Sequence, residues 1–168
     1  DIGELVGANG RALDRAMLDV VTRCSIACGG HAGSPESMRT MLTAARTRQI
    51  APGAHPSYPD RSGFGRRSID ISLEELEACL TSQLQDIRNM ADQVGVPLTH
   101  LKPHGALYND AQDDPALSGL LVDMSARAGL ALVSMPKSLI QKKAAERNIR
   151  FIGEAFIDRR YNIYLVNT

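Results

Sequence analysis

The sequence predicts an α/β fold built on a parallel sheet, and three observations support that expectation. Segments with the three-to-four-residue apolar spacing of amphipathic helices alternate strictly with short apolar runs suited to buried strands. Ser or Asp stands at the start of three helical segments, as expected for helix N-caps. No low-complexity stretch or linker interrupts the alternation. This pattern requires helical crossovers between parallel strands, in either a doubly wound open sheet or a barrel.

The first third of the chain is predicted to hold two helices and two strands. A helix over residues 13–23 depends on its apolar spacing, and a strand over residues 24–28 follows it. The next helix runs from Ser34 to about residue 48, because Ser34 suits the N-cap, Pro35 the first turn and Glu36 the positive end of the helix dipole. A strand over residues 50–54 comes next.

The clearest helix spans residues 73–94, where apolar residues recur at steps of three and four. Ser72 and Glu75 have the spacing of a capping box at its start, and Gly95 and Pro97 end it. The elements predicted after it are a strand over 98–102, a helix from 114 to about 128 that opens with Asp-Pro, a strand over 130–134, a helix over 137–147 and a strand over 150–154.

The composition is that of an ordinary globular protein and predicts a single domain over residues 1–168. Hydrophobic residues make up 43% and charged residues 23%, and the 19 basic side chains balance the 19 acidic ones. This balance argues against a nucleic-acid partner, and no apolar run approaches the ~20 residues that cross a bilayer. Three cysteines and no secretory leader lead us to expect a cytoplasmic protein. A start at Asp1 without Met suggests a trimmed chain.

Reactive side chains follow four of the predicted strands. They are His31 after the first strand, His55 after the second, Lys102 and His104 after the third, and Glu154 and Asp158 after the last. Because the loops at the carboxyl ends of parallel strands converge on one edge of a sheet, we expect these groups to share an active site.

Other candidate residues have competing interpretations. His100 lies inside an apolar strand and is expected to be structural, and Cys24, Cys28 and Cys79 are expected to pack rather than to bind a metal. The arginines beside the Gly63-Phe64-Gly65 stretch and near the end of the chain are either solvated or a clamp for a carboxylate or phosphate. These arginines are Arg61, Arg66, Arg67, Arg159 and Arg160.

Several common motifs are missing from the sequence. It has no P-loop, no glycine-rich dinucleotide-binding pattern and no Gly-x-Ser-x-Gly elbow. No Ser or Cys nucleophile is therefore indicated, which leaves Asp, Glu, His and Lys to activate water.

Six motifs in a fixed order resemble the LamB/YcsF family, whose members are described as the A component of the bacterial 5-oxoprolinase. The motifs cover residues 1–4, 26–33, 53–60, 63–67, 102–109 and 154–161. The resemblance implies an irregular β/α barrel of the glycoside hydrolase/deacetylase type. We expect a partial barrel, because the family's first strand and C-terminal third have no counterpart in this sequence. Gly30 also stands where the family pattern has an aromatic residue, and residues 162–168 match poorly.

The resemblance implies ATP-dependent opening of 5-oxo-L-proline, a five-membered lactam, to L-glutamate. It also implies subunits B and C as partners and Mg²⁺ with ATP, and it is compatible with a homo-oligomer. We expect no tightly bound cofactor in this chain. Because a P-loop is missing, we expect ATP to act on the partner subunits, while this chain performs the hydrolytic ring opening.

The same resemblance and the chemistry of ring opening assign roles at the strand ends. Lys102 is expected to face the carbonyl oxygen, and Arg66 or Arg159 to hold the substrate carboxylate. The expected catalytic residues are Lys102, His104, His55, Glu154 and Asp158, and the expected substrate-binding residues are His31, Tyr58, Arg66, Asn109, Arg159 and Glu4.

Two alternatives remain open. A metal-dependent amidohydrolase or deacetylase would use His31, His55 and either Asp1 or Glu4 as metal ligands at the same edge. A non-catalytic regulatory subunit of a lactam-utilisation complex would also agree with the resemblance.

Overall fold

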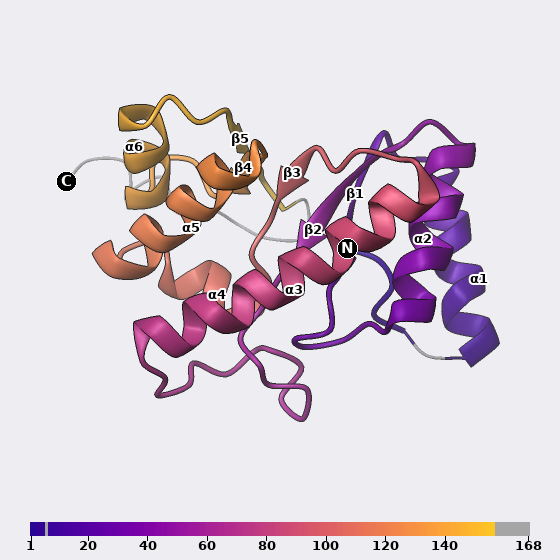
Figure 1. Cartoon of the computed structure of the whole chain (residues 1–168), viewed down its shortest axis with the longest axis horizontal. Helices are drawn as coiled ribbons and strands as arrows, with labels where there is room; N and C mark the ends of the chain where they lie inside the picture. The colour runs from indigo at the N-terminus through magenta and orange to yellow at the C-terminus, as the bar shows by residue number, and fades with distance from the viewer. Residues whose placement is uncertain (6, 157–168) are drawn as a thin grey trace.

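In the described part of the chain, five parallel strands form one sheet in which each strand pairs with the next in sequence (Figure 1). The structure is a computed structural model that describes residues 1–5 and 7–156. The strands are β1 (Arg23–Ala27), β2 (Ala51–His55), β3 (His100–Leu101), β4 (Ala131–Ser134) and β5 (Phe151–Gly153).

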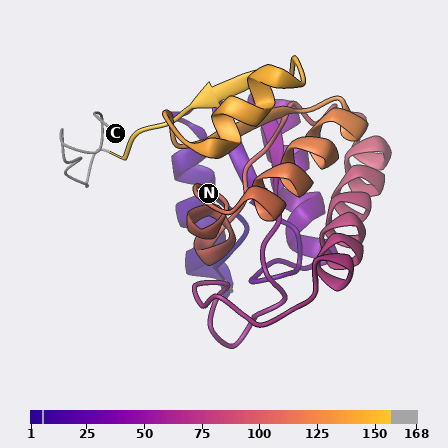
Figure 2. The ribbon, with the colours of Figure 1, turned by 90° about the vertical axis from the view of Figure 1, so that its left-hand side faces the viewer.

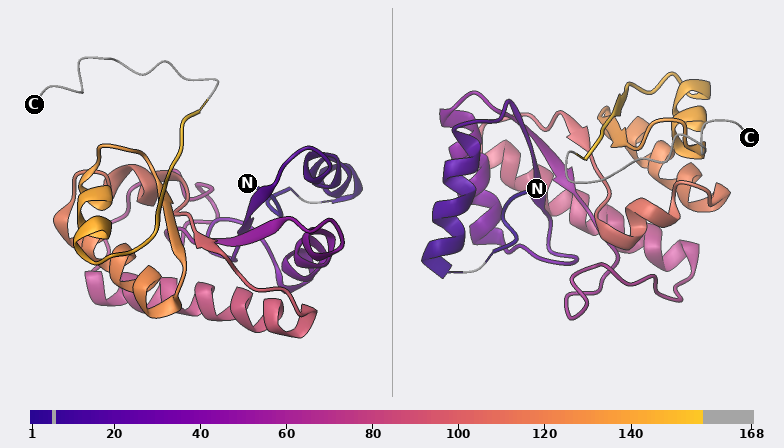
Figure 3. Two further views of the ribbon diagram at one scale, coloured as in Figure 1. Left: turned by 90° about the horizontal axis from the view of Figure 1, so that it is seen from above. Right: turned by 180° about the vertical axis from the view of Figure 1, so that it is seen from behind.

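Helices connect the strands and cover the outside of the curved sheet (Figure 3). They are α1 (Gly7–Leu18), α2 (Pro35–Thr47), α3 (Leu73–Val94), α4 (Gly105–Asp110), α5 (Pro115–Ala128) and α6 (Leu139–Glu146). Helix α2 packs against α1 and α3, and α5 lies between α3 and α6 (Figure 2). The core fills the space between this helical layer and the sheet, with Ile26, Leu80 and Leu101 fully buried. No helix of the described residues is long and apolar enough to cross a membrane.

The strand order distinguishes a barrel from a doubly wound sheet. A doubly wound sheet reverses its strand order and carries helices on both faces, whereas here the order follows the sequence from β1 to β5. The five strands do not close on themselves, and Ile2 forms a parallel bridge with Ile26 on the outer side of β1. The expected partial (β/α) barrel is therefore confirmed.

The helix caps predicted from the sequence are present. Helix α3 has the predicted bounds: the Ser72 hydroxyl accepts from the Glu75 N–H at 3.2 Å, and the Glu75 carboxylate accepts from the Ser72 N–H at 3.2 Å. Ser34 and Asp114 cap α2 and α5 in the same way through their side-chain oxygens. These local signals position the helices that join β1 to β2, β2 to β3, and β3 to β4.

Two predictions about the helices were wrong. The first helix spans residues 7–18 instead of 13–23, because Leu18 is the last residue that reaches the core and the exposed Val20 lies in the turn before β1. Helix α4 was not predicted at all, since six residues carry too little periodicity to be recognised. Strand β3 is also shorter than predicted.

The segment over residues 56–72, between β2 and α3, folds across the carboxyl ends of the strands. The Gly65 N–H donates to the Asp60 carbonyl at 2.8 Å, and the Ala106 N–H donates to the Gly65 carbonyl at 2.9 Å. Gly65 has a φ of +63°, and a Cβ there would lie 2.8 Å from the His31 Cβ. Position 65 therefore requires glycine both for its backbone conformation and for the close approach to the histidine.

Candidate active site

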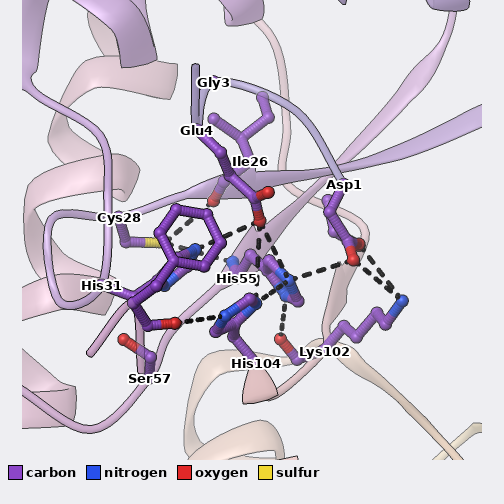
Figure 4. A network of polar contacts seen from close by, with 12 residues as sticks. Asp1, Gly3, Glu4, Ile26, Cys28, His31, His55, Ser57, Lys102 and His104 are labelled. Atoms are coloured by element: carbon purple, nitrogen blue, oxygen red, sulfur yellow. Dashed lines mark hydrogen bonds and ion pairs between the residues drawn. The ribbon is translucent and has the colours of Figure 1, made fainter. Parts of the chain in front are cut away.

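Side chains from four parts of the chain meet at the carboxyl ends of β1, β2 and β3 (Figure 4). His31 follows β1, His55 is the last residue of β2, and His104 follows β3. Glu4 points toward all three rings from the segment beside β1. We call Glu4, His31, His55 and His104 the histidine cluster.

Backbone carbonyl groups fix the protons of two histidine rings. His55 Nδ1 donates to the Lys102 carbonyl at 2.7 Å, and His104 Nε2 donates to the Phe64 carbonyl at 2.9 Å. Because a carbonyl oxygen only accepts hydrogen bonds, each of these ring nitrogens must carry the proton. The other two nitrogens, His55 Nε2 and His104 Nδ1, lie 3.0 Å apart and face each other.

Glu4 and His31 complete the histidine cluster. His31 Nε2 lies 3.2 Å from Glu4 Oε1, and the His31 ring stacks on the His104 ring with 3.6 Å between the ring centroids. Glu4 Oε1 is also 3.8 Å from His55 Nε2 and 3.6 Å from His104 Nδ1. One carboxylate oxygen therefore faces all three imidazoles.

Burial keeps the histidines of the cluster uncharged at neutral pH. Desolvation, reinforced by the charge of Lys102, lowers the pKa of His55 to about 3, and desolvation and the neighbouring histidines lower the pKa of His104 to about 4. Desolvation also lowers the pKa of His31, against the effect of Glu4. For Glu4, burial raises the pKa, but the hydrogen bond with His31 and the nearby histidines outweigh burial and lower it to about 2. The cluster thus combines a carboxylate with neutral imidazoles.

Lys102 lies between two carboxylates next to the histidine cluster. Its Nζ is 3.1 Å from Asp1 Oδ1 and 3.1 Å from Glu154 Oε2, and its side chain is 12% exposed. Asp1 Oδ2 is in turn 3.3 Å from His55 Nε2, so Asp1 connects the ammonium group to the cluster. The expected convergence of Glu154 with Lys102 is therefore confirmed.

A cavity of about 440 Å³ opens beside these groups, which is within the size range of small-molecule sites (~300–1,000 Å³). Its lining residues include Asp1, His55, Arg66, Lys102, His104, Asn109 and Phe156. Glu4 and His31 line a second cavity of about 380 Å³. The histidine cluster therefore borders two cavities.

Some predicted site residues lie elsewhere. The Tyr58 hydroxyl donates to Asp110 at 3.0 Å, and its side chain lines a separate cavity beneath α3 and α5. Arg61 donates to the Gly29 and Gly33 carbonyls, and Arg67 pairs with Asp60, so Arg66 is the one arginine of this trio that lines the cavity beside Lys102.

Asp158, Arg159 and Arg160 lie outside the described residues. The expectations that Asp158 acts in catalysis and that Arg159 binds substrate therefore stay predictions.

Three contributions to the site were missed from the sequence. The Phe64 carbonyl sets the protonation of His104, and a backbone acceptor has no signature in the residue types. Asp1 was considered only as a metal ligand, not as a partner of Lys102. Phe156, whose ring lies 5.5 Å from Lys102 Nζ, could have been singled out as an apolar residue two positions after Glu154.

The four side chains of the histidine cluster could hold a metal ion. Their ligand atoms all lie within 4.8 Å of one another. Imidazole nitrogen and carboxylate oxygen are the ligand types of catalytic zinc sites. His100, in contrast, is buried on β3, where its Nε2 is 3.1 Å from Ser25 Oγ and its Nδ1 2.8 Å from Thr99 Oγ1, apart from the cluster.

Comparisons with known proteins agree on the family. The model of the LamB/YcsF family matches residues 1–164. The chain is 39% identical over 163 residues to one of the 5-oxoprolinase A subunits of Pseudomonas syringae pv. tomato, covering 96% of the chain and 64% of that protein. It is 41% identical over 163 residues to the 5-oxoprolinase A subunit of Chloroflexus aggregans, covering 96% of the chain and 65% of that protein.

A solved structure gives the same result. The fold matches the crystal structure of a lactam utilization protein from Thermus thermophilus with a TM-score of 0.84 and 34% sequence identity. The match covers 94% of this chain and 62% of that one. The chain thus spans somewhat less than two thirds of the length of these relatives.

Proposed function

Because the chain belongs to the LamB/YcsF family, we propose that it is the ring-opening component of an ATP-dependent 5-oxoprolinase. The names of its relatives support a lactam as the substrate class and a multi-subunit enzyme as its setting. One observation carries the assignment of chemistry to this chain: the Lys102 ammonium group lies between Asp1 and Glu154 on the wall of a cavity that fits a small molecule.

The proposed reaction begins with activation of the lactam, because an unactivated cyclic amide is a poor electrophile. ATP, with Mg²⁺, phosphorylates the carbonyl oxygen on partner subunits B or C. A water oxygen then bonds to the activated carbon, the ring C–N bond breaks and the nitrogen takes up a proton. The resulting acyl phosphate reacts with a second water to give glutamate and phosphate.

Side chains around the cavity supply what the ring-opening steps need. Lys102 stabilises the negative charge that develops on oxygen, with Asp1 and Glu154 holding its ammonium group in place. Arg66 and Asn109 lie where they can bind the substrate carboxylate and amide. The histidine cluster, next to Lys102, positions the attacking water.

The test measures glutamate release from 5-oxo-L-proline and ATP by the full-length protein, with and without its partner subunits. Lys102→Met should lower turnover by about 10²-fold or more, the scale seen when one oxyanion-stabilising group is removed. Its circular dichroism spectrum and Tm should stay close to those of the unmodified protein. Lys142→Met, which removes an exposed lysine of α6, is the matched control and should keep full turnover.

Two results would contradict the proposal. Full turnover by folded Lys102→Met would remove Lys102 from the chemistry. Full turnover of the complex after substitution of Lys102, His55 and His104 in turn would instead favour a regulatory role for this chain.

A further inference from the structure

The facing nitrogens of His55 and His104 present an electrostatic problem. Each ring already donates its proton to a backbone carbonyl, so His55 Nε2 and His104 Nδ1 both present lone pairs. They lie 3.0 Å apart, and two lone pairs at that distance repel each other unless a positive species lies between them. Glu4 Oε1 adds a third electron pair, 3.6 and 3.8 Å away.

The three ligand atoms have the spacing of a metal site. The point equidistant from His55 Nε2, His104 Nδ1 and Glu4 Oε1 in their plane is about 2.0 Å from each atom, as their three separations require. Bonds from zinc to histidine nitrogen and carboxylate oxygen have this length, about 2.0–2.2 Å. A single ion could therefore contact all three atoms with little rearrangement.

We propose that Glu4, His55 and His104 bind one divalent transition-metal ion of the zinc type, and that His31 orients the Glu4 carboxylate. The hydrogen bonds from His55 to the Lys102 carbonyl and from His104 to the Phe64 carbonyl are the interactions that hold metal-binding histidines in the correct tautomer. His31, 3.2 Å from Glu4 Oε1, supports the carboxylate ligand.

A proton shared by the two rings explains the geometry less well than an ion does. A proton would bridge His55 and His104 but leave Glu4 Oε1 at 3.6 and 3.8 Å, beyond hydrogen-bond length. An ion at the common centre satisfies all three atoms. Two imidazoles favour zinc, copper, nickel or iron over magnesium, which prefers oxygen ligands in octahedral geometry.

The ion would lie at the same edge of the sheet as Lys102, and its proposed role deepens the function proposed above. Three protein ligands leave a position open, the arrangement of catalytic rather than structural zinc sites. Asp1, 3.3 Å from His55 Nε2, lies beside that position and also pairs with Lys102. A metal there would act as a Lewis acid next to the cavity.

Metal binding can be tested without turnover, so its failure and the failure of the 5-oxoprolinase proposal are distinguishable. Full-length protein treated with a chelator is titrated with ZnCl₂ and, separately, with MgCl₂ by calorimetry, and zinc content after dialysis is measured by mass spectrometry. We expect one Zn²⁺ per chain, no comparable Mg²⁺ binding, and a higher Tm with zinc. Glu4→Gln and His104→Ala should weaken zinc binding by about 10²-fold or more, and His31→Asn by about 10- to 100-fold.

Two controls address unspecific binding and misfolding. Cys79→Ser removes the one half-buried thiol among the described cysteines, and His100→Gln removes a buried histidine outside the cluster; both should keep zinc affinity. Visible absorption of the Co²⁺-substituted unmodified protein reports nitrogen and oxygen ligation without any variant. Absence of stoichiometric zinc binding, or affinity unchanged in folded Glu4→Gln, overturns the proposal. Nitrogen NMR that detects a proton shared by His55 and His104 in protein saturated with zinc would do the same.

Discussion

The ammonium group of Lys102 lies 3.1 Å from Glu154 Oε2, so the residues that follow β3 and β5 meet across the end of β4. Glu154→Gln keeps the size of this side chain and removes its charge. We expect the free energy of unfolding to fall by only about 1 kcal/mol, because the pair is partly exposed and Asp1 still contacts Lys102. Turnover should fall tenfold or more, since Lys102 loses one of the two groups that position it. Urea unfolding and glutamate release on one preparation measure both effects.

The matched control for Glu154→Gln is Asp123→Asn, which breaks the exposed pair of Asp123 with Arg147. This variant should change neither stability nor turnover measurably. If Glu154→Gln loses stability but keeps full turnover, Glu154 is a structural ion-pair partner and not part of the reaction.

The three histidines on β2, on β3 and after β3 should separate by effect. His55→Ala and His104→Ala should lower turnover by about 10²-fold, the scale of a lost acid, base or water-positioning group. His100→Ala should instead lower the free energy of unfolding by about 2 kcal/mol, because it leaves a void over Gly53 and removes the partner of the Ser25 hydroxyl. Steady-state turnover and Tm of each variant test this division, which the reverse pattern would refute.

Gly65→Ala should damage the site more than its size suggests. The new Cβ would meet the His31 Cβ at 2.8 Å and the His104 ring at 3.0 Å, so the histidine cluster must shift. Gly95→Ala is the control, because Gly95 has a similar φ of +74° but only Arg46 atoms, 3.9 Å away, near its Cβ position. Both variants should lose about 1 kcal/mol from backbone strain, and only Gly65→Ala should also lose turnover. Equal turnover in the two variants would show that the close approach is unimportant.

His100 should make the fold sensitive to acid. Burial, with the charge of Arg23 and the nearby histidine and lysine, lowers the pKa of His100 from 6.5 to about 4. The unfolded chain therefore takes up a proton on this residue below about pH 6.5, whereas the folded chain does so only near pH 4. The resulting stability is present above pH 6.5 and is lost as the pH falls toward 4, by up to about 3 kcal/mol. Unfolding of His100→Gln at a series of pH values should show a correspondingly shallower decline; an identical slope would contradict this account.

Features with local causes could be predicted from the sequence. The bounds of α3 follow from Ser72, Glu75 and Gly95, and the parallel sheet follows from the alternation of helices and strands. The meeting of His31, His55, His104 and Lys102 also followed from the rule that loops converge at the carboxyl ends of strands. What could not be predicted depends on long-range geometry: the short α4, the displacement of Tyr58 toward Asp110, and the use of the Phe64 carbonyl as an acceptor.

The orientation of a single peptide group, between Phe64 and Gly65, selects which nitrogen of His104 is available to a ligand. Both residues have positive φ values, 56° and 63°, and the flanking hydrogen bonds to Asp60 and Ala106 hold the group in this orientation. The electronic state of the imidazole is thus encoded in backbone conformation, not in any side chain at position 64. Evolution or engineering can exchange the Phe64 side chain without altering that state, whereas a rotation of the peptide plane would invert it with every residue of the histidine cluster intact.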